Sequence, residues 1–312
     1  GWMRLLHARL LVYLDEVARC GSIRKAALRL NVAASSINRQ ILALEADAGV
    51  PLFERLPHRL RLTAAGEVLI AHIRRTIHDF DRTQAHIEDL RGSRRGEVTV
   101  AIMGGIGSDL LARTAMAFRE RRPRVKLVFH RFGLADMLAA LRDGRVDLGL
   151  AFGMVAQPDM RVLLEMDCAI GAVMAPSHKL ASHPRVKLGD LLSHRLVWPA
   201  ETMTMRQVLD RIFDSAGMSA EPFVEANEVE LMKRLVVLDK SITLLNRLNV
   251  EAELQRGELV FVPIEGSNLP VQTLRLVELA QRTPTILSST FAETLLRVAD
   301  EIVPGLTATG RS

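Results

Sequence analysis

Cysteine is nearly absent from the 312-residue sequence, which contains only Cys20 and Cys168. Two thiols this far apart cannot build the disulfide framework of a small secreted protein, and they match none of the paired spacings of a zinc site. The sequence therefore predicts a protein of a reducing compartment, with no metal site and with each cysteine acting as a small buried side chain.

Long uncharged apolar runs are missing as well. No stretch approaches the ~18 consecutive apolar residues that a membrane-spanning helix requires. The chain also does not open with the charged, apolar and small-residue segments of a secretory signal. We therefore expect a cytoplasmic protein with no membrane partner.

Catalytic and cofactor motifs are a third absence. The sequence has no Walker loop and no HExxH, GxSxG or CxxC pattern. A glycine-rich loop at residues 104–107 follows a predicted strand, but a dinucleotide fingerprint would need glycine in place of Leu110. His130 and Arg131 stand where an acidic ribose ligand would end the next strand. We expect neither an enzyme nor a bound cofactor.

The charge is unevenly distributed along a chain long enough for two or three domains. Residues 1–95 contain 16 Lys and Arg against 10 Asp and Glu, whereas residues 96–312 contain 25 against 26. Lys and Arg supply most of the non-specific affinity for a phosphate backbone. This distribution predicts that the N-terminal part alone binds a polyanion.

Residues 22–45 have the pattern of two short helices joined by a tight turn. Ser22 is placed to cap the first helix, because its hydroxyl can accept an N–H of the first turn. In the second helix Ile37, Ile41 and Leu44 are spaced by four and three residues, which makes one apolar stripe that must be buried.

The opposite side of the second helix carries Ser35, Asn38 and Arg39. Such a small polar set suits reading of the major groove, because Arg contacts guanine and Asn contacts adenine. An ordinary helical hairpin with a solvated polar face is the alternative interpretation.

The following residues favour a winged helix-turn-helix. Gly49 ends the second helix, a hairpin tip is predicted at residues 56–59, and Leu60 and Leu62 then alternate with arginines as in a half-buried strand. We expect Ser35, Asn38 and Arg39 to read bases and the wing arginines to contact mainly the DNA backbone. The full set of expected DNA-binding residues is Ser22, Ser35, Ser36, Asn38, Arg39, Arg55, His58, Arg59 and Arg61.

This N-terminal part resembles the DNA-binding domain of the LysR-type transcriptional regulators. The matching positions are Gly21-Ser22, Ala26-Ala27, Leu30, Arg39-Gln40-Ile41, Leu44-Glu45, Gly49, Leu52-Phe53, Arg55, Leu62-Thr63 and Gly66. The resemblance implies a ligand-responsive regulator that binds double-stranded operator DNA. The sequence departs from the family at Ala33-Ala34, where a Ser-Gln pair is usual, and at Asn38, where Ser is usual. Because Ala33 is a poor cap, the helix is predicted either to start later, at Ser35, or to have a loose first turn.

A long helix is predicted from Thr63, its expected cap, to residue 90. Apolar residues recur along it in alternating steps of four and three, which is typical of a coiled-coil seam. The expected dimerisation residues are Leu69, Ile73, Phe80, Ile87 and Leu90. Packing of this stripe on the chain's own body is the alternative. The resemblance favours a homodimer or homotetramer, and a two-fold DNA site needs two reading heads.

From residue 96 the pattern becomes strand, helix, strand, which predicts a parallel sheet with right-handed crossovers. Expected elements are strands at 97–103, 125–131 and 146–152, and helices at 108–121 and 134–143. The chain is expected to enter a second lobe near Leu164 and to return with a strand at 271–279 and a helix at 286–302. The stretches at residues 96–103 (GEVTVAIM), 141–147 (LRDGRVD) and 175–180 (APSHKL) resemble the two-lobed LysR effector domain, which is similar to periplasmic binding proteins of type II.

The predicted fold class is therefore multidomain. An all-α-type winged helix-turn-helix (residues 4–63) and a linker helix (64–92) precede an α/β effector domain (96–303). Within that domain, lobe I comprises residues 96–164 and 268–303, and lobe II comprises residues 165–267.

Ligands of open parallel sheets bind beyond the carboxyl ends of the strands, where helix N-termini favour anions. The expected effector-binding residues are Gly104, Gly105, Ile106, His130, Phe152, Thr202, Thr204, Asn227 and Asn246. Thr202 or Thr204, and Asn227, are also candidates for capping their own helices. Met103 and Leu134 would make part of the site apolar, which favours an organic acid. A small-molecule receptor or enzyme-like α/β protein with a helical N-terminal appendage is the alternative, but the basic winged head favours a regulator.

Overall fold

The structure is a computed structural model that describes residues 9–57, 59–90, 96–266, 270–304 and 306–308. It contains two compact units, one made mainly of residues up to Arg95 and the other mainly of residues from Gly96 onward. Parts of the sequence predictions lie outside the described residues: the start of the winged domain at residues 4–8, His58, the side chain of Leu90, and the end of the linker at residues 91–92.

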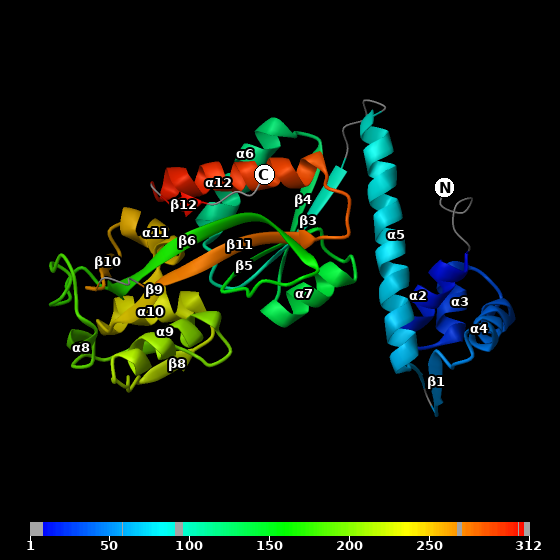
Figure 1. Cartoon of the computed structure of the whole chain (residues 1–312), viewed down its shortest axis with the longest axis horizontal. Coiled ribbons are helices and arrows are strands. Elements are labelled where there is room, and N and C mark those ends of the chain that lie inside the picture. Colours follow the sequence, from blue (N-terminus) through cyan, green and yellow to red (C-terminus); the bar gives the residue numbers. More distant parts are fainter. Residues whose placement is uncertain (1–8, 58, 91–95, 267–269, 305, 309–312) are drawn as a thin grey trace. The chain divides into compact units, whose positions relative to one another are not determined.

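The N-terminal unit is a winged helix-turn-helix followed by one long helix (Figure 1). Its described elements are α2 (Leu10–Cys20), α3 (Ile23–Leu30), α4 (Ala34–Ala48), β1 (Phe53–Leu56), β2 (Arg59–Leu62) and α5 (Ala64–Leu90).

The helix-turn-helix forms for the reasons that the sequence indicates. The Ser22 hydroxyl accepts a hydrogen bond from the backbone N–H of Lys25 and caps α3. Ile37 and Ile41 of α4 lie in the core of the unit. Helix α4 already begins at Ala34, although no side chain caps it at Ala33. The predicted later start at Ser35 is therefore wrong, because helix propagation and burial of the apolar stripe do not require a side-chain cap.

The wing is held against the start of α5 by close backbone packing. Thr63 caps α5 as expected, since its hydroxyl accepts a hydrogen bond from the N–H of Gly66 at 3.0 Å. A Cβ atom on Gly66 would lie 2.1 Å from the carbonyl oxygen of Leu52. Only glycine fits there, which explains in physical terms one of the positions that carry the family resemblance.

The C-terminal unit is a two-lobed α/β structure (Figure 1). Lobe I contains β3 (Gly96–Ile102), α6 (Ser108–Arg121), β4 (Val125–Arg131), α7 (Leu134–Arg142), β5 (Leu148–Phe152) and α12 (Ile286–Ile302). Lobe II contains α8 (Leu188–Leu191), β7 (Val197–Pro199), α9 (Thr204–Ser215), β8 (Val224–Ala226), α10 (Val229–Asp239), β9 (Thr243–Asn246), α11 (Arg247–Gln255) and β10 (Val260–Pro263). The long strand β6 (Met160–Met174) runs through both lobes: it pairs with β11 (Val271–Leu279) in lobe I and with β9 and β10 in lobe II. The short strand β12 (Thr307–Ala308) also pairs with β6.

The sheet of lobe I has the predicted parallel part and an antiparallel addition. Strand β3 pairs in parallel with β4 and β5, while β11 pairs antiparallel with both β5 and β6. Helices α6 and α12 pack together on one face, and α7 covers the other (Figure 1). The core of lobe I therefore lies in two layers, one on each side of the sheet.

Two features of the second unit differ from the sequence predictions. The entry into lobe II, expected near Leu164, takes place inside β6, a single strand of 15 residues that starts in lobe I. Helix α11 was not predicted, because apolar residues on it do not follow one helical face: Leu248, Asn249 and Val250 are consecutive and all buried.

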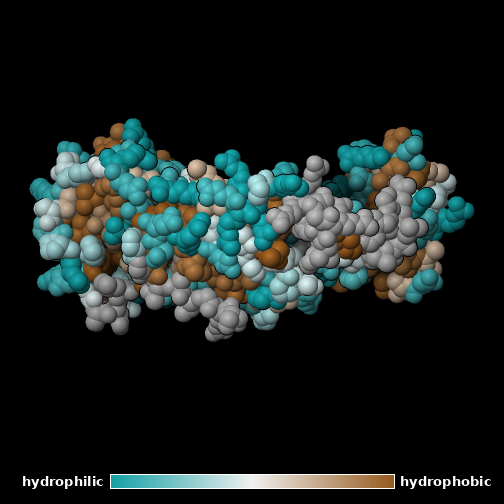
Figure 2. All heavy atoms as spheres, turned by 90° about the horizontal axis from the view of Figure 1, so that it is seen from above, coloured by the Kyte–Doolittle hydropathy of each residue, from teal (hydrophilic) through white to brown (hydrophobic). Residues whose placement is uncertain are grey.

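Hydrophilic side chains cover much of the molecular face in Figure 2, with separate groups of apolar residues between them. In the described ranges of the chain, no helix is long and apolar enough to cross a membrane.

Candidate nucleic-acid interface and effector cleft

The exposed side of α4 carries the predicted base-reading residues. Ser35 and Arg39 are exposed, and Ser36 and Asn38 are half-buried. Because Ile37 and Ile41 hold the other side of α4 in the core, these polar side chains face away from the body of the unit. Ser22 is half-buried at the start of α3, where its oxygen accepts the capping hydrogen bond.

The arginines of this surface differ in whether they already have partners. Arg55 Nη2 donates to Asn38 Oδ1 at 2.9 Å, so a wing residue holds the amide of a helix residue. Arg61 forms an ion pair with Glu54, its cross-strand neighbour in the wing, at 2.8 Å. Among the residues that the structure describes, Arg39 and Arg59 have no ion-pair or hydrogen-bond partner for their side chains. These two cations are available for phosphate or base.

The first turns of α5 belong to the core of the head. Ile73 is 1% exposed and packs with the apolar residues of α2 to α4, and Leu69 packs half-buried beside it. The burial of Ile73 needs no second subunit, so its predicted place in a dimer seam is corrected to a place in the head core. Phe80 is also buried within one chain, whereas Ile87 remains half-exposed.

A cleft of about 410 Å³ lies between the two lobes of the second unit. Six of the nine residues predicted for effector binding line it: Gly104, Gly105, Phe152, Thr202, Thr204 and Asn227. They come from strand ends in lobe I and from the starts of helices α9 and α10 in lobe II. The rule for ligand sites in open parallel sheets therefore leads to the sheet edge at which this cleft lies.

Three of the predicted effector-binding residues do not line the cleft. Ile106 is 6% exposed and belongs to the core of lobe I. His130 is exposed outside the cleft, because neighbouring side chains of a strand point to opposite faces and Arg131 takes the inward place. Asn246 is fully buried, since it caps the unpredicted helix α11 and donates to Gln272 Oε1 at 2.7 Å.

Helices α9 and α10 at the cleft do not have the N-cap residues that the sequence predicts. Met203 occupies the N-cap position of α9 without any side-chain hydrogen bond, and Glu228 rather than Asn227 caps α10. The Thr204 hydroxyl donates to the carbonyl oxygen of Phe152 at 3.1 Å and accepts from Gln272 Nε2 at 3.3 Å. Thr204 thus joins the lobes, while the exposed Thr202 and the start of α9, which has no side-chain cap, line the cleft.

The lobes approach closely on the inner side of the cleft. The side-chain amide of Asn249 donates to the carbonyl oxygen of Gly105. Gly105 has a positive φ of 89°, and a Cβ there would lie 3.0 Å from Val229 Cγ2. At Gly153 a Cβ would lie 2.7 Å from Thr204 Cβ. Glycine at both positions allows backbone of lobe I to contact lobe II.

Several lining residues were not predicted from the sequence. The charged ones are Arg131, at the end of β4, and Glu228, at the start of α10, and their side chains lie 3.5 Å apart as an ion pair. The uncharged ones are Phe132, Gly133, Met203, Met205, Val229, Leu245, Asn249 and Gln272. Met103 and Leu134, which were predicted to make part of the site apolar, also line the cleft. Arg131 follows His130 directly, so the strand end that lines the cleft is the predicted one, but the side chain that lines it is that of the next residue.

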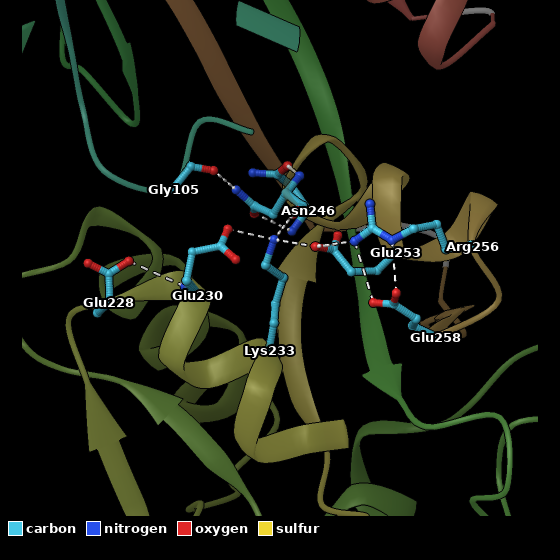
Figure 3. Close-up of polar contacts among 9 residues, drawn as sticks. Gly105, Glu228, Glu230, Lys233, Asn246, Glu253, Arg256 and Glu258 are labelled. Atoms are coloured by element: carbon cyan, nitrogen blue, oxygen red, sulfur yellow. Dashed lines mark hydrogen bonds and ion pairs between the residues drawn. The ribbon is translucent and has the colours of Figure 1, made fainter. Parts of the chain in front are cut away.

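A buried lysine fixes α10 to α11 behind the cleft (Figure 3). Lys233 Nζ lies 3.0 Å from both Glu253 Oε1 and the carbonyl oxygen of Asn249, and 2.7 Å from Glu230 Oε1. The Lys233 side chain is 7% exposed. A buried ammonium with three acceptors is satisfied, so this group is structural rather than a free ligand-binding cation.

The remaining titratable groups do not form a reactive or metal-binding site in the part of the chain that the structure describes. A hydrogen bond to Glu16 raises the pKa of Cys20, and burial raises the pKa of Cys168 to about 12. The rings of His178 and His194 are 4.7 Å apart, and burial followed by the charge of His194 lowers the pKa of His178. No group of three or more potential metal ligands occurs among the described residues.

Comparison with known sequences agrees with this architecture. Residues 8–67 match the model of the bacterial regulatory helix-turn-helix protein, lysR family, and residues 91–300 match the LysR substrate binding domain. The HTH-type transcriptional regulator CbbR of Rhodospirillum rubrum is 26% identical over 266 residues, which cover 85% of this chain and 87% of CbbR.

Solved structures have the same fold at low sequence identity. A full-length variant of OxyR from Pseudomonas aeruginosa superposes with a TM-score of 0.72 at 18% identity, over 96% of both chains. Full-length CbnR in complex with its target DNA gives a TM-score of 0.55 at 23% identity, over 93% of this chain and 99% of CbnR. Because the two family models together span most of the sequence, the chain belongs to the LysR family of DNA-binding transcriptional regulators with an effector-binding domain, and it is not an enzyme.

Proposed function

We propose that this protein is a sequence-specific transcriptional regulator that responds to a small organic anion bound between the lobes of its C-terminal unit. The observation that carries the proposal is the combination, in one chain, of a winged head with unpartnered surface arginines and a cleft lined from both lobes. The regulator acts in the cytoplasm, on double-stranded operator DNA.

In the head, we assign base reading to Arg39, Asn38 and Ser35, with support from the neighbouring Ser36. Arg55, His58, Arg59 and Arg61 hold the DNA backbone, with Arg59 placed at the wing to reach a minor groove. Support comes from the exposure of Arg39 on α4 and from the lack of a partner for Arg59 among the described residues. Arg can bind guanine through two hydrogen bonds, which gives a helix-borne Arg its selectivity.

In the cleft, the start of α9 supports binding of an anion. A helix N-terminus carries a partial positive charge, and α9 has no side-chain cap to use its first-turn N–H groups. Thr202 adds a hydroxyl and Arg131 a full charge. Met103, Phe152 and Met205 line the same space, so a ligand with an apolar body and a carboxylate fits better than a bare inorganic ion.

Binding of small carboxylic acids to the full chain tests the anion site. Titration calorimetry would compare the wild type with Thr202→Ala across mono- and dicarboxylic acids and their uncharged amides. We expect acids but not amides to bind, and Thr202→Ala to weaken acid binding by about fivefold, the loss of one hydrogen bond. Ser177→Ala, an exposed residue outside the cleft, is the control. Equal binding of acids and amides would exclude an anion site.

We further propose that the protein is a homodimer or homotetramer built on α5. Ile87 is half-exposed on the predicted seam, so a partner helix could bury it. Ile87→Asp should therefore shift the sedimentation of the full chain toward monomer and weaken DNA binding. Asp at Ile73 or Phe80 is not a useful test, because burial within one chain means that it would disrupt the fold. An Ile87→Asp variant that sediments like the wild type would remove α5 from the interface.

A further inference from the structure

An ion pair closes the outer side of the cleft. Arg131 Nη1 of lobe I lies 3.5 Å from Glu228 Oε2 of lobe II, and both residues line the cleft. They are the only charged residues among the described lining residues. The one full positive charge offered to an anionic ligand is therefore already opposed by a carboxylate of the protein.

Glu228 holds this position from a rigid support. Its Oε1 accepts a hydrogen bond from the backbone N–H of Glu230 at 3.3 Å and so caps α10, while its Oε2 faces Arg131. The helix itself is fixed to α11 by buried Lys233, one turn further on (Figure 3). The Glu228 carboxylate therefore lies at the cleft on the start of a helix that is anchored to α11.

The pair is nevertheless easy to open. The Arg131 side chain is 57% exposed and that of Glu228 is 48% exposed. Pairs of exposed charges contribute little because water screens them, and a separation of 3.5 Å is long for a charge-assisted hydrogen bond. If Arg131 turned to another anion, Glu228 would keep its capping hydrogen bond and could be solvated.

We propose that Glu228 is an internal competitor for the effector: the carboxylate of a small organic acid replaces it on Arg131. This inference rests on the proposed effector site. The planar guanidinium binds a carboxylate through two parallel hydrogen bonds, which a ligand free to orient can make better than a side chain held by its helix. The pair joins lobe I to lobe II, and exchange moves that connection onto the ligand. The effector thereby favours a different spacing of the lobes.

Calorimetric titration of the full chain with succinate, glutarate and benzoate, and with their amides, tests the exchange. Glu228→Gln removes the competing charge but keeps an oxygen that can cap α10. We expect it to tighten binding of the acids by about twofold to fivefold, the strength of an exposed ion pair, and to leave the amides unchanged. Arg131→Gln should weaken acid binding by about tenfold or more, because a charged bidentate partner is lost.

Glu230→Gln is the matched control. It removes the same charge from the first turn of α10, but Glu230 pairs with Lys233 and does not line the cleft. If Glu230→Gln tightens acid binding as much as Glu228→Gln, the effect is one of general charge and the competition is refuted.

The remaining outcomes separate this inference from the proposed function. Acids that bind the wild type and are unaffected by changes at Arg131 and Glu228 would leave the anion site standing and overturn the exchange. If no acid binds to the wild type or to Glu228→Gln, both the organic-anion assignment and the exchange fail.

Discussion

The N-terminal unit (the head) and the cleft differ in whether the protein itself neutralises their positive charges. On the head, Arg39 and Arg59 have no side-chain partner among the described residues. In the cleft, Arg131 is paired with Glu228, and behind it Lys233 is buried among three acceptors. The two arginines of the head are therefore free to bind a polyanion. In the cleft, by contrast, an anion must first replace Glu228 on Arg131.

This difference separates two kinds of recognition. Binding by unpartnered cations depends strongly on salt, because each phosphate contact releases counterions. Exchange at a paired cation depends on the difference between two similar interactions and is less sensitive to salt. Removing individual side chains can test this contrast between unpartnered and paired cations.

The largest effect is expected from removing Lys233, a cation of the C-terminal unit whose role is structural. Lys233→Ala should lower the free energy of unfolding of the C-terminal unit by about 3 kcal/mol, because Glu253 keeps only its exposed partner Arg256 and the carbonyl oxygen of Asn249 loses its donor. Chemical denaturation of the full chain measures this. Arg256→Ala, which removes an exposed partner of the same Glu253, should cost less than about 1 kcal/mol. Equal costs would mean that Lys233 does not stabilise the unit.

Arg39→Ala should produce the largest loss of DNA selectivity. We expect a cost of about 1 to 3 kcal/mol on the cognate site and much less on random DNA, whereas Arg59→Ala should weaken both alike and lower the salt dependence. Fluorescence anisotropy at several salt concentrations measures both. Arg113→Ala, which removes an exposed arginine of the C-terminal unit, is the control. Equal losses on both DNAs for Arg39→Ala would contradict its role in reading bases.

A smaller effect is expected from the hydrogen bond between Arg55 and Asn38. Because Arg55 holds the Asn38 amide, replacing both by Ala should cost less DNA affinity than the sum of the single changes, with a coupling of about 0.5 to 1 kcal/mol. A double-mutant cycle on the cognate site measures it. Additive losses would show that the two residues act independently when DNA is bound.

Treatment of the folded chain with a thiol reagent at pH 8 should leave both cysteines unmodified. Only the thiolate reacts, and with a pKa of about 12 roughly 10⁻⁴ of Cys168 is ionised at that pH. The raised pKa of Cys20 acts in the same direction. Both cysteines should react quickly only after unfolding in guanidinium, as absorbance of the released reagent would show. Rapid modification of the folded chain at pH 8 would contradict this.

Sequence reasoning predicted well those features that depend on neighbouring residues. Helix α6 and strands β4 and β11 have the predicted bounds, because each is an apolar pattern ended by local signals such as the Pro123 after α6. The exposed polar face of α4 follows from one helical period. In each case a few consecutive residues determine the outcome.

The sequence predicts the approximate position of the cleft, but not all of the side chains that line it. The rule for sheet edges selects the right strand ends, but a shift of one residue decides between His130 and Arg131. Helix α11 lacks a single apolar face, so Asn246 could not be recognised as its buried cap. The pairing of Arg131 with Glu228 joins residues nearly a hundred positions apart, and no local pattern in either segment predicts it.

The continuous strands β6 and β11 have a consequence for movement between the lobes. They remain hydrogen-bonded to each other from Val271 opposite Ala169 to Leu279 opposite Met160, with one irregularity at Leu276 and Val277. Free rotation about a loop would leave these hydrogen bonds intact, but bending a paired ribbon must stretch some of them. Because β6 continues from this pairing into its pairing with β9 and β10, a change in the angle between the lobes would strain hydrogen bonds where the two pairings meet.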